Sequence, residues 1–269
     1  MEKKFKIGVI GAGYMASSII VRAISLGVLE ASDVIVSDLN DDALLKFSKL
    51  GATTTKNNLE LANVSEFIFF SVKPQNFNTI ATEIKGCSCK KFVSIMAGVK
   101  ICKIKASLSN DILVARCMPN APCAVGKGAV GIDLTDFNNI TDINFIKSLF
   151  NAGADVIEVK EDLLNAVTGI SGSAPAYFYL FAKGLIDAGV KNGLTKEQAF
   201  RFVVNTMIGS GEMLLSFKDK SIEDLIDSVC SKGGTTVEAI KTYNENNLNL
   251  TTEKAVEACV KRSFELENL

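Results

Sequence analysis

The first pattern that could support chemistry lies near the start of the chain, in the stretch VIGAGYMAS. Gly11, Gly13 and Ala16 follow the order G-x-G-x-x-A, after an apolar run and at the start of a helix-like segment. The first glycine permits a tight turn, the second lets a pyrophosphate approach the backbone, and the small third residue lets the helix pack on the sheet. Free N–H groups at the helix start attract an anion. The pattern predicts a dinucleotide-binding turn, and glycines that serve only the turn are the alternative.

An acidic side chain follows the second apolar run, in VSDLN. Asp38 lies about 20 residues beyond the glycine turn, where a carboxylate accepts a hydrogen bond from the adenosine ribose 2′-hydroxyl and repels a 2′-phosphate. Because Leu39 follows it, rather than an arginine, the residues favour NADH over NADPH. In the alternative interpretation Asp38 caps the next helix, a role that Asn40 could fill equally well.

The second pattern is SKGGTT, Ser231 to Thr236, ahead of the helix-like run VEAIKTY. Thr235 and Glu238 have capping-box spacing, so the start of a helix explains them and one glycine. It does not explain Thr236 or the second glycine. Backbone N–H groups of a glycine-rich turn at a helix N-terminus suit a carboxylate.

The elements that must position the first turn are short apolar runs that alternate with helical patterns, up to about residue 160. Unbroken apolar runs are typical of strands covered on both faces, and the alternation predicts an α/β fold with a Rossmann-type, doubly wound, mostly parallel sheet. Strands are expected at 6–11, 33–37, 67–72, 91–96, 112–116, 129–133 and 155–159, and helices at 15–26 and 41–50.

Beyond about residue 160 the strand patterns stop, which predicts two domains, 1–160 and an all-helical 161–269. Thr195 and Gln198 have capping-box spacing at the start of one helix. Its large apolar residues then point all round, so it must be buried on every side. A region of about 110 residues offers little core for that, so a partner chain is the expected cover. A further docking helix is expected from Thr251 onward.

Composition excludes several function classes. The 269 residues are 48% hydrophobic, and 29 Lys and Arg nearly balance 30 Asp and Glu, which argues against a nucleic-acid groove or a polybasic membrane surface. No apolar stretch approaches the roughly 20 residues that span a bilayer. The seven cysteines are scattered, without a CxxC pair or any histidine, so no metal site is expected. We interpret them as small buried residues of a protein in a reducing cytoplasm.

Six ordered motifs, which span nearly the whole length, together resemble the pyrroline-5-carboxylate reductase family. They are GAGYMA (11–16), SVKPQ (71–75), SIMAGV (94–99), RCMPNAP (116–122), SGSAPAY (171–177) and SKGGTT (231–236). The resemblance implies reduction of 1-pyrroline-5-carboxylate to L-proline by hydride transfer from NADPH or NADH, the last step of proline biosynthesis. It also implies an N-terminal dinucleotide-binding domain and a helical C-terminal domain that binds substrate and pairs with a second copy, as a homodimer or larger homo-oligomer.

The resemblance also implies the residues of both sites. Those expected at the cofactor are Gly11, Ala12, Gly13, Tyr14, Met15, Ser37, Asp38, Asn58 near the adenosine ribose, Ser71, Val72, Lys73 and Pro74, with Ala97, Gly98 and Met118 to Asn120 beside the nicotinamide. Those expected at the cyclic imino acid are Ser231, Gly233, Gly234, Thr235 and Thr236. Individually, Lys73 could be a solvated charge, and Pro74 and Pro119 ordinary loop residues.

Chemistry without histidine is plausible because the cofactor carries the difficult step. We assign Thr236 as the catalytic residue, with its hydroxyl bound to the ring nitrogen. Since a hydroxyl is a weak acid, solvent or already protonated substrate supplies the proton. The chain departs from the family where Lys232 replaces a proline and Ser221-Ile222 a His-Pro pair. The family also more often favours NADPH, in contrast to Asp38.

Two other functions fit the same architecture. One is a reductase of another cyclic imine or of a β-hydroxyacid, which would need a lysine general acid such as Lys183 or Lys191. The other is a dinucleotide-sensing paralogue without catalysis, which would need only the glycines of the first domain. The intact GGTT and SGSAPAY motifs argue against the sensor.

Overall fold

The computed structural model describes residues 4–267. They form two compact units. The first runs to Pro175 and takes in the end of the chain from Ala258, and the second is Ala176–Glu257. The last strand ends at Glu158, whereas the first compact unit continues to Pro175, so the end of the sheet does not coincide with the end of the unit. The domain boundary expected at residue 160 stays a prediction.

The first unit is built on an 8-stranded sheet with the order β3-β2-β1-β4-β5-β6-β7-β8. Every neighbouring pair is parallel except β6 and β7, which are antiparallel. This confirms the expected mostly parallel, doubly wound sheet. The strands are β1 (Phe5–Ile10), β2 (Val34–Ser37), β3 (Thr53–Thr55), β4 (Ser65–Phe70), β5 (Lys91–Ser94), β6 (Leu113–Met118), β7 (Gly128–Asp133) and β8 (Ala154–Glu158).

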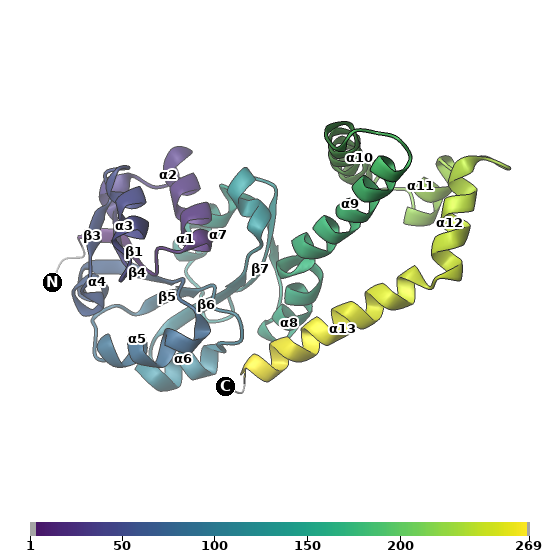
Figure 1. Cartoon of the computed structure of the whole chain (residues 1–269). Coiled ribbons are helices and arrows are strands. Elements are labelled where there is room, and N and C mark those ends of the chain that lie inside the picture. The colour runs from purple at the N-terminus through teal and green to yellow at the C-terminus, as the bar shows by residue number, and fades with distance from the viewer. Residues whose placement is uncertain (1–3, 268–269) are drawn as a thin grey trace. The chain divides into compact units, whose positions relative to one another are not determined.

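Helices cover both faces of this sheet (Figure 1). The helices are α1 (Tyr14–Ala16), α2 (Arg22–Ser25), α3 (Asp41–Ser48), α4 (Asn58–Val64), α5 (Phe77–Glu83), α6 (Ile101–Leu108), α7 (Ile140–Asn151) and α8 (Leu164–Val167). Apolar residues of α1, α2, α3 and α7 form the core on one face, and those of α4, α5 and α6 form the core on the other. Strand residues buried on both sides explain why the sequence runs were apolar without alternation.

Two π-helical stretches interrupt the helices. Ser17–Val21 joins α1 to α2, so the expected first helix exists but is wound differently in its middle. Thr168–Gly172 follows α8 and lies at the start of the SGSAPAY motif. Wide turns of this kind occur often near functional sites. The sequence patterns did not predict β3, whose three threonines carry no apolar signal.

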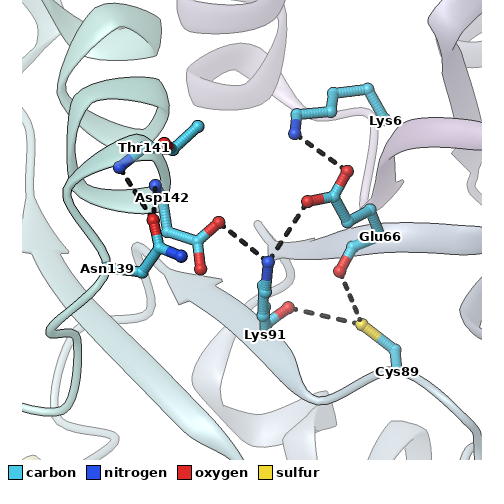
Figure 2. Close-up of polar contacts among 7 residues, drawn as sticks. All are labelled: Lys6, Glu66, Cys89, Lys91, Asn139, Thr141 and Asp142. Atoms are coloured by element: carbon cyan, nitrogen blue, oxygen red, sulfur yellow. Dashed lines mark hydrogen bonds and ion pairs between the residues drawn. The ribbon is translucent and has the colours of Figure 1, made fainter.

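A four-residue charge cluster fastens the amino-terminal ends of the central strands to α7 (Figure 2). Glu66 of β4 accepts from Lys6 of β1 at 2.8 Å and from Lys91 of β5 at 3.2 Å. Lys91 also pairs with Asp142 at 2.8 Å, and Asn139 caps the start of α7 beside it. Both lysines lie over the ring of a phenylalanine in β4. The cluster joins β1, β4, β5 and α7 at the amino-terminal ends of the strands, whereas the glycine turn lies at the carboxyl end of β1.

The cluster also shifts two acid constants. Burial alone would raise the pKa of Glu66, but hydrogen bonds and the charges of Lys6 and Lys91 outweigh it and lower that pKa. Burial likewise opposes the change at Lys91, yet Asp142 and Glu66 raise its pKa. A carboxyl group whose pKa is lowered on folding stabilises the folded state at pH values above its unfolded pKa, and this stability is lost as the pH falls through its folded pKa. A lysine whose pKa is raised on folding stabilises the folded state at pH values below its unfolded pKa. The cluster therefore stabilises the fold at neutral pH.

The helices beyond residue 173 are α9 (Ala174–Lys191), α10 (Lys196–Ser216), α11 (Ile222–Ser228), α12 (Thr235–Glu245) and α13 (Leu248–Glu267). Thr195 caps α10 in the expected capping box, because its hydroxyl accepts from Gln198 N and the Gln198 side chain accepts from Thr195 N. No strand follows β8 within the described residues, as expected. The last helix begins at Leu248, a few residues earlier than its expected start at Thr251.

The cysteines correct one expectation. All seven are free, but only Cys89, Cys117 and Cys123 are buried, whereas Cys102 is exposed on α6. The apolar positions of α6 face the sheet, and Cys102 lies on its solvent side. Burial raises the pKa of Cys117 and Cys123, so these two thiols are kept protonated and unreactive. Among residues 4–267, no helix is both long and apolar enough to cross a membrane.

Candidate active site

The glycine turn lies where the strand order reverses. β1 has β2 on one side and β4 on the other, so the chain crosses the sheet in opposite directions from this point. Ligands of open parallel sheets bind at the carboxyl ends of such a pair. Gly11 follows β1 and has a φ of 98°, and a Cβ on it would lie 2.7 Å from the Ser71 carbonyl oxygen that follows β4. Glycine is therefore required at residue 11 by conformation and by space.

Gly13 is different, because nothing in its own surroundings requires a glycine. Its φ of −67° and ψ of −175° are available to any residue, and a Cβ there would meet no atom within 4 Å. It is the N-cap of α1, and no side chain among the described residues caps that helix. A small residue before free helix N–H groups suits a ligand that must come close to the backbone. The turn therefore fits a dinucleotide pyrophosphate.

Asp38 is held at the end of β2 by two backbone donors. Ala12 N donates to Oδ2 at 2.7 Å and Asn40 N donates to Oδ1 at 2.8 Å. Asn40, not Asp38, caps α3, since its side chain accepts from the N–H groups of Asp42 and Ala43. The helix-cap alternative for Asp38 is therefore wrong. Its carboxylate is fixed beside the glycine turn, with Ser37 buried before it.

A hollow of about 630 Å³ lies next to the end of β2. Its lining comes from the segments after β2 and β3 and from one side of α5. The lining residues are Leu39, Lys56, Asn57, Asn58, Leu59, Asn76, Thr79, Ile80 and Glu83. Asn58, expected near the adenosine ribose, is thus in the lining, and its Nδ2 donates to Glu83 Oε2 at 2.6 Å. Sequence patterns missed Glu83, Asn76 and Thr79, because α5 and its N-cap Asn76 meet this hollow only through the sheet order.

The remaining cofactor candidates follow β4, β5 and β6. Ser71 N donates to Ile10 O, which joins the ends of β4 and β1. Lys73 is exposed, and Pro74 opens a 3₁₀ turn, as the loop interpretation of that proline expected. A Cβ on Gly98, whose φ is 71°, would lie 3.0 Å from the backbone of Leu266 near the end of α13. The loop at Ala97 and Gly98 is therefore packed by the end of the chain.

Asn120 uses both ends of its amide within the protein. Its Nδ2 donates to Ser171 Oγ at 3.1 Å, and its Oδ1 accepts from Ala129 N at 3.0 Å. It therefore joins the MPN turn to the SGSAPAY motif and to β7. Met118 and Pro119 beside it are buried. These bonds show a structural role for Asn120, and its contact with the cofactor stays a prediction.

A buried arginine that sequence reasoning did not assign lies behind the Ala97–Gly98 loop. Arg116 of β6 is 1% exposed and pairs with Glu161 at 3.0 Å and with Glu267 at 3.1 Å. Glu161 also accepts from Ile101 N, at the start of α6, and Lys100 pairs with Glu267 at 3.0 Å. Burial would raise the pKa of Glu267, but these cations and Asn165 lower it. The cluster fixes the end of α13 to the loop.

The SKGGTT turn lies in the second unit. Gly233 has a φ of 73°, and Gly234 N donates to Ser231 O at 2.8 Å, which closes the turn. Gly234 is the N-cap of α12, and no side chain in the described part of the chain caps that helix. The expected capping box of Thr235 and Glu238 is therefore wrong. Thr235 is the first residue of the helix and not its N-cap, so its hydroxyl does not accept a hydrogen bond from Glu238 N.

The turn consequently leaves its polar groups available. Neither the Thr235 nor the Thr236 hydroxyl has a hydrogen-bond partner within residues 4–267, and Thr236 is half-buried. A Cβ on Gly234 would lie 2.4 Å from Ser231 Oγ. A larger residue at Gly234 would therefore displace the Ser231 side chain of the same turn.

Comparison with known proteins covers both units. A family model described as pyrroline-5-carboxylate reductase dimerisation matches residues 161–266, and one described as NADP oxidoreductase, coenzyme F420-dependent, matches residues 6–98. The pyrroline-5-carboxylate reductase of Staphylococcus aureus (strain COL) is 36% identical over 96% of this chain and 97% of its own length. That of Pisum sativum is 32% identical over 99% of this chain and 97% of its own length.

The chain belongs to the pyrroline-5-carboxylate reductase family. Two solved structures agree with this. The Coxiella burnetii pyrroline-5-carboxylate reductase has a TM-score of 0.89, 32% identity and coverage of 98% of this chain and 99% of its own. The Plasmodium falciparum pyrroline carboxylate reductase, solved with NADP bound, has a TM-score of 0.88, 30% identity and coverage of 99% and 100%.

Membership confirms the family, the fold class and the enzymatic function expected from the sequence, the reduction of 1-pyrroline-5-carboxylate to L-proline. The cofactor is a nicotinamide dinucleotide, and the dimerisation model supports a homo-oligomer.

The two glycines of the first turn give opposite expectations. Gly13→Val should weaken NADH binding on the order of 10- to 100-fold with an unchanged melting temperature, because the new side chain enters open space where we expect the pyrophosphate to bind. Gly11→Ala should lower the melting temperature, because its backbone and the Ser71 carbonyl oppose a Cβ. Thermal unfolding beside fluorescence titration with NADH checks both, and unchanged NADH affinity in Gly13→Val would contradict the placement.

Proposed function

We propose that the chain reduces 1-pyrroline-5-carboxylate with NADH, holding the dinucleotide at the Gly11–Ala16 turn and the imino acid at the Ser231–Thr236 turn. The observation that carries the second assignment is the start of α12. Its N-cap is Gly234, which has no side chain, so within residues 4–267 no side chain caps the first N–H groups of α12 and neither threonine hydroxyl has a hydrogen-bond partner. A turn that served only to start a helix would not require two threonines after a pair of glycines.

The substrate carries a carboxylate close to a ring nitrogen, and the turn offers groups for both. The N–H groups at the start of α12 suit the carboxylate by hydrogen bonding and by the helix dipole, without a cationic side chain. Gly233 gives the turn its left-handed backbone, and Ser231 closes it. The Thr236 hydroxyl would then orient the ring by a hydrogen bond to nitrogen. Positioning supplies most of the rate enhancement in this arrangement.

The bound nicotinamide supplies the hydride, and the protein has only to position the two molecules and keep the imine electrophilic. There is no histidine in the chain, and Thr236 is too weak an acid to be a proton source at neutral pH. We infer that its hydroxyl orients the imine and that the proton comes from solvent or from substrate that is already protonated. The β-hydroxyacid alternative is disfavoured, because Lys183 is exposed and paired with Asp187 on the same helix.

Removal of the Thr236 hydroxyl should affect the reaction and not the fold. Thr236→Val keeps the side-chain shape, so we expect kcat/KM for the imine to fall on the order of 10- to 1000-fold with little change in melting temperature or NADH affinity. The control is Thr242→Val on the same helix, whose hydroxyl donates only to Glu238 O. Steady-state kinetics of both variants test the role of the Thr236 hydroxyl. Near-normal turnover by Thr236→Val would show that Thr236 is not a catalytic residue.

Asp38 supports NADH as the electron donor. Its carboxylate is fixed by Ala12 N and Asn40 N and carries a full negative charge where the ribose is expected. A 2′-phosphate would have to approach this anion, and the next side chain, Leu39, is 89% exposed and uncharged. The relative with NADP bound shows that the family also accepts the phosphorylated cofactor. The residue after β2 would then set the preference in each member.

The donor preference can be changed at this position. In Asp38→Ser/Leu39→Arg, the carboxylate is lost and a guanidinium is gained, so the ratio of kcat/KM with NADPH to that with NADH should rise on the order of tenfold or more. The wild-type protein, assayed with both donors at fixed imine concentration, is the reference. A strong wild-type preference for NADPH would show that the inference from Asp38 is wrong.

We further propose that the helices of the second unit pair with a second copy of this chain, as a dimer or larger assembly. In the single chain Phe200 is 54%, Phe202 65% and Ile208 60% exposed on α10, and Tyr179 and Leu180 of α9 are also open. Soluble monomers rarely leave a large continuous apolar surface exposed. The match to a dimerisation model over these residues supports the same partner.

Light scattering at micromolar protein concentration should give the mass of at least two chains. Phe202→Asp, at the first half of α10, should raise the dissociation constant of the assembly, because a charge would be buried without a partner. Lys49→Asp, at the exposed end of α3 and outside the residues that match the dimerisation model, serves as the control. A wild-type mass of one chain would refute the assembly.

A further inference from the structure

We infer that Glu83 is a second determinant of the choice between NADH and NADPH. Its carboxylate makes the hollow next to the end of β2 unfavourable for the 2′-phosphate of NADPH. The inference rests on the proposed placement of the adenosine ribose near Asp38 and Asn58. It adds a residue from a different element, because Glu83 belongs to the last turn of α5 and lies 25 positions beyond Asn58 in the chain.

The first argument is hydrogen bonding. Asn58 lies at the start of α4 in the lining, and its Nδ2 donates to Glu83 at 2.6 Å. Its Oδ1 is enclosed and has no partner among the described residues. One of the two N–H groups of Asn58 Nδ2 is thereby used, and a phosphate oxygen that accepted from the other would lie close to the Glu83 carboxylate. The neighbouring Asn57 side chain accepts from Glu60 N as the cap of α4.

The second argument is charge. Lys56 is the one cation among the lining residues, and its Nζ is paired with Asp41 at 2.8 Å. Glu83 therefore contributes a negative charge that no cation of the lining neutralises. A 2′-phosphate carries about two negative charges, so it would be repelled, whereas a ribose with a free hydroxyl would not. The hollow and the fixed Asp38 carboxylate thus discriminate in the same direction.

Two substitutions separate charge from hydrogen bonding. Glu83→Gln keeps an acceptor for Asn58 Nδ2 and removes the charge, whereas Glu83→Ala removes both. The control is Glu30→Gln, which makes the same change in net charge at an exposed position before β2 and outside the lining. The probes are ADP-ribose and its 2′-phosphate, titrated calorimetrically into the whole protein, so that the readout does not depend on turnover.

We expect Glu83→Gln to tighten binding of the 2′-phosphate about 3- to 10-fold and to leave ADP-ribose within about twofold of wild type. The gain should shrink as salt is raised, since the charges are close to solvent. Glu30→Gln should change neither. An unchanged ratio of the two dissociation constants in Glu83→Gln would overturn the inference, as would a gain confined to Glu83→Ala.

The same titrations separate this inference from the proposed function. If Asp38→Ser/Leu39→Arg moves the ratio and Glu83→Gln does not, the site is right and Glu83 has no part in donor choice. If wild type binds neither probe, or if no variant moves the ratio and turnover strongly prefers NADPH, the NADH assignment itself fails.

Discussion

The close approach of β1 and β4 at their carboxyl ends is the constraint on which the rest of the first unit depends. At that point only a residue without Cβ fits between the turn and the Ser71 carbonyl, and only a left-handed backbone lets the chain leave the strand toward α1. The turn then places Ala12 N where it binds Asp38, and so fixes the end of β2 as well. One steric requirement thereby sets the positions of the carboxyl ends of β1, β2 and β4, where we propose that the cofactor binds.

Sequence patterns predicted those features that depend on neighbours along the chain. The apolar runs located the strands because a sheet covered on both faces needs apolar residues at every position, as in β4. The capping box of α10 was predicted because both partners lie within one turn. β3 was missed because its short threonine run has no apolar signal of its own.

The predicted capping box at the start of α12 is wrong for a related reason. Capping-box spacing states which pairs could bond, but the backbone decides which residue stands outside the helix, and here it is Gly234. Contacts between distant residues carried no local signal at all. Asn58 with Glu83 and Arg116 with Glu267 are joined only by the sheet order and by the return of α13.

The Arg116 ion pairs have a consequence for the order in which the protein can be made. Arg116 precedes Glu267 by 151 positions, and its guanidinium is almost wholly removed from water. Until the last helix has been synthesised, that charge has Glu161 but lacks the second carboxylate, and a buried charge short of a partner is costly. Most of the first compact unit precedes the second in the sequence, yet Arg116 gains its second carboxylate only when Glu267 has been synthesised. On the ribosome, the ion pairs of the first compact unit can therefore be completed only after the second unit has been synthesised.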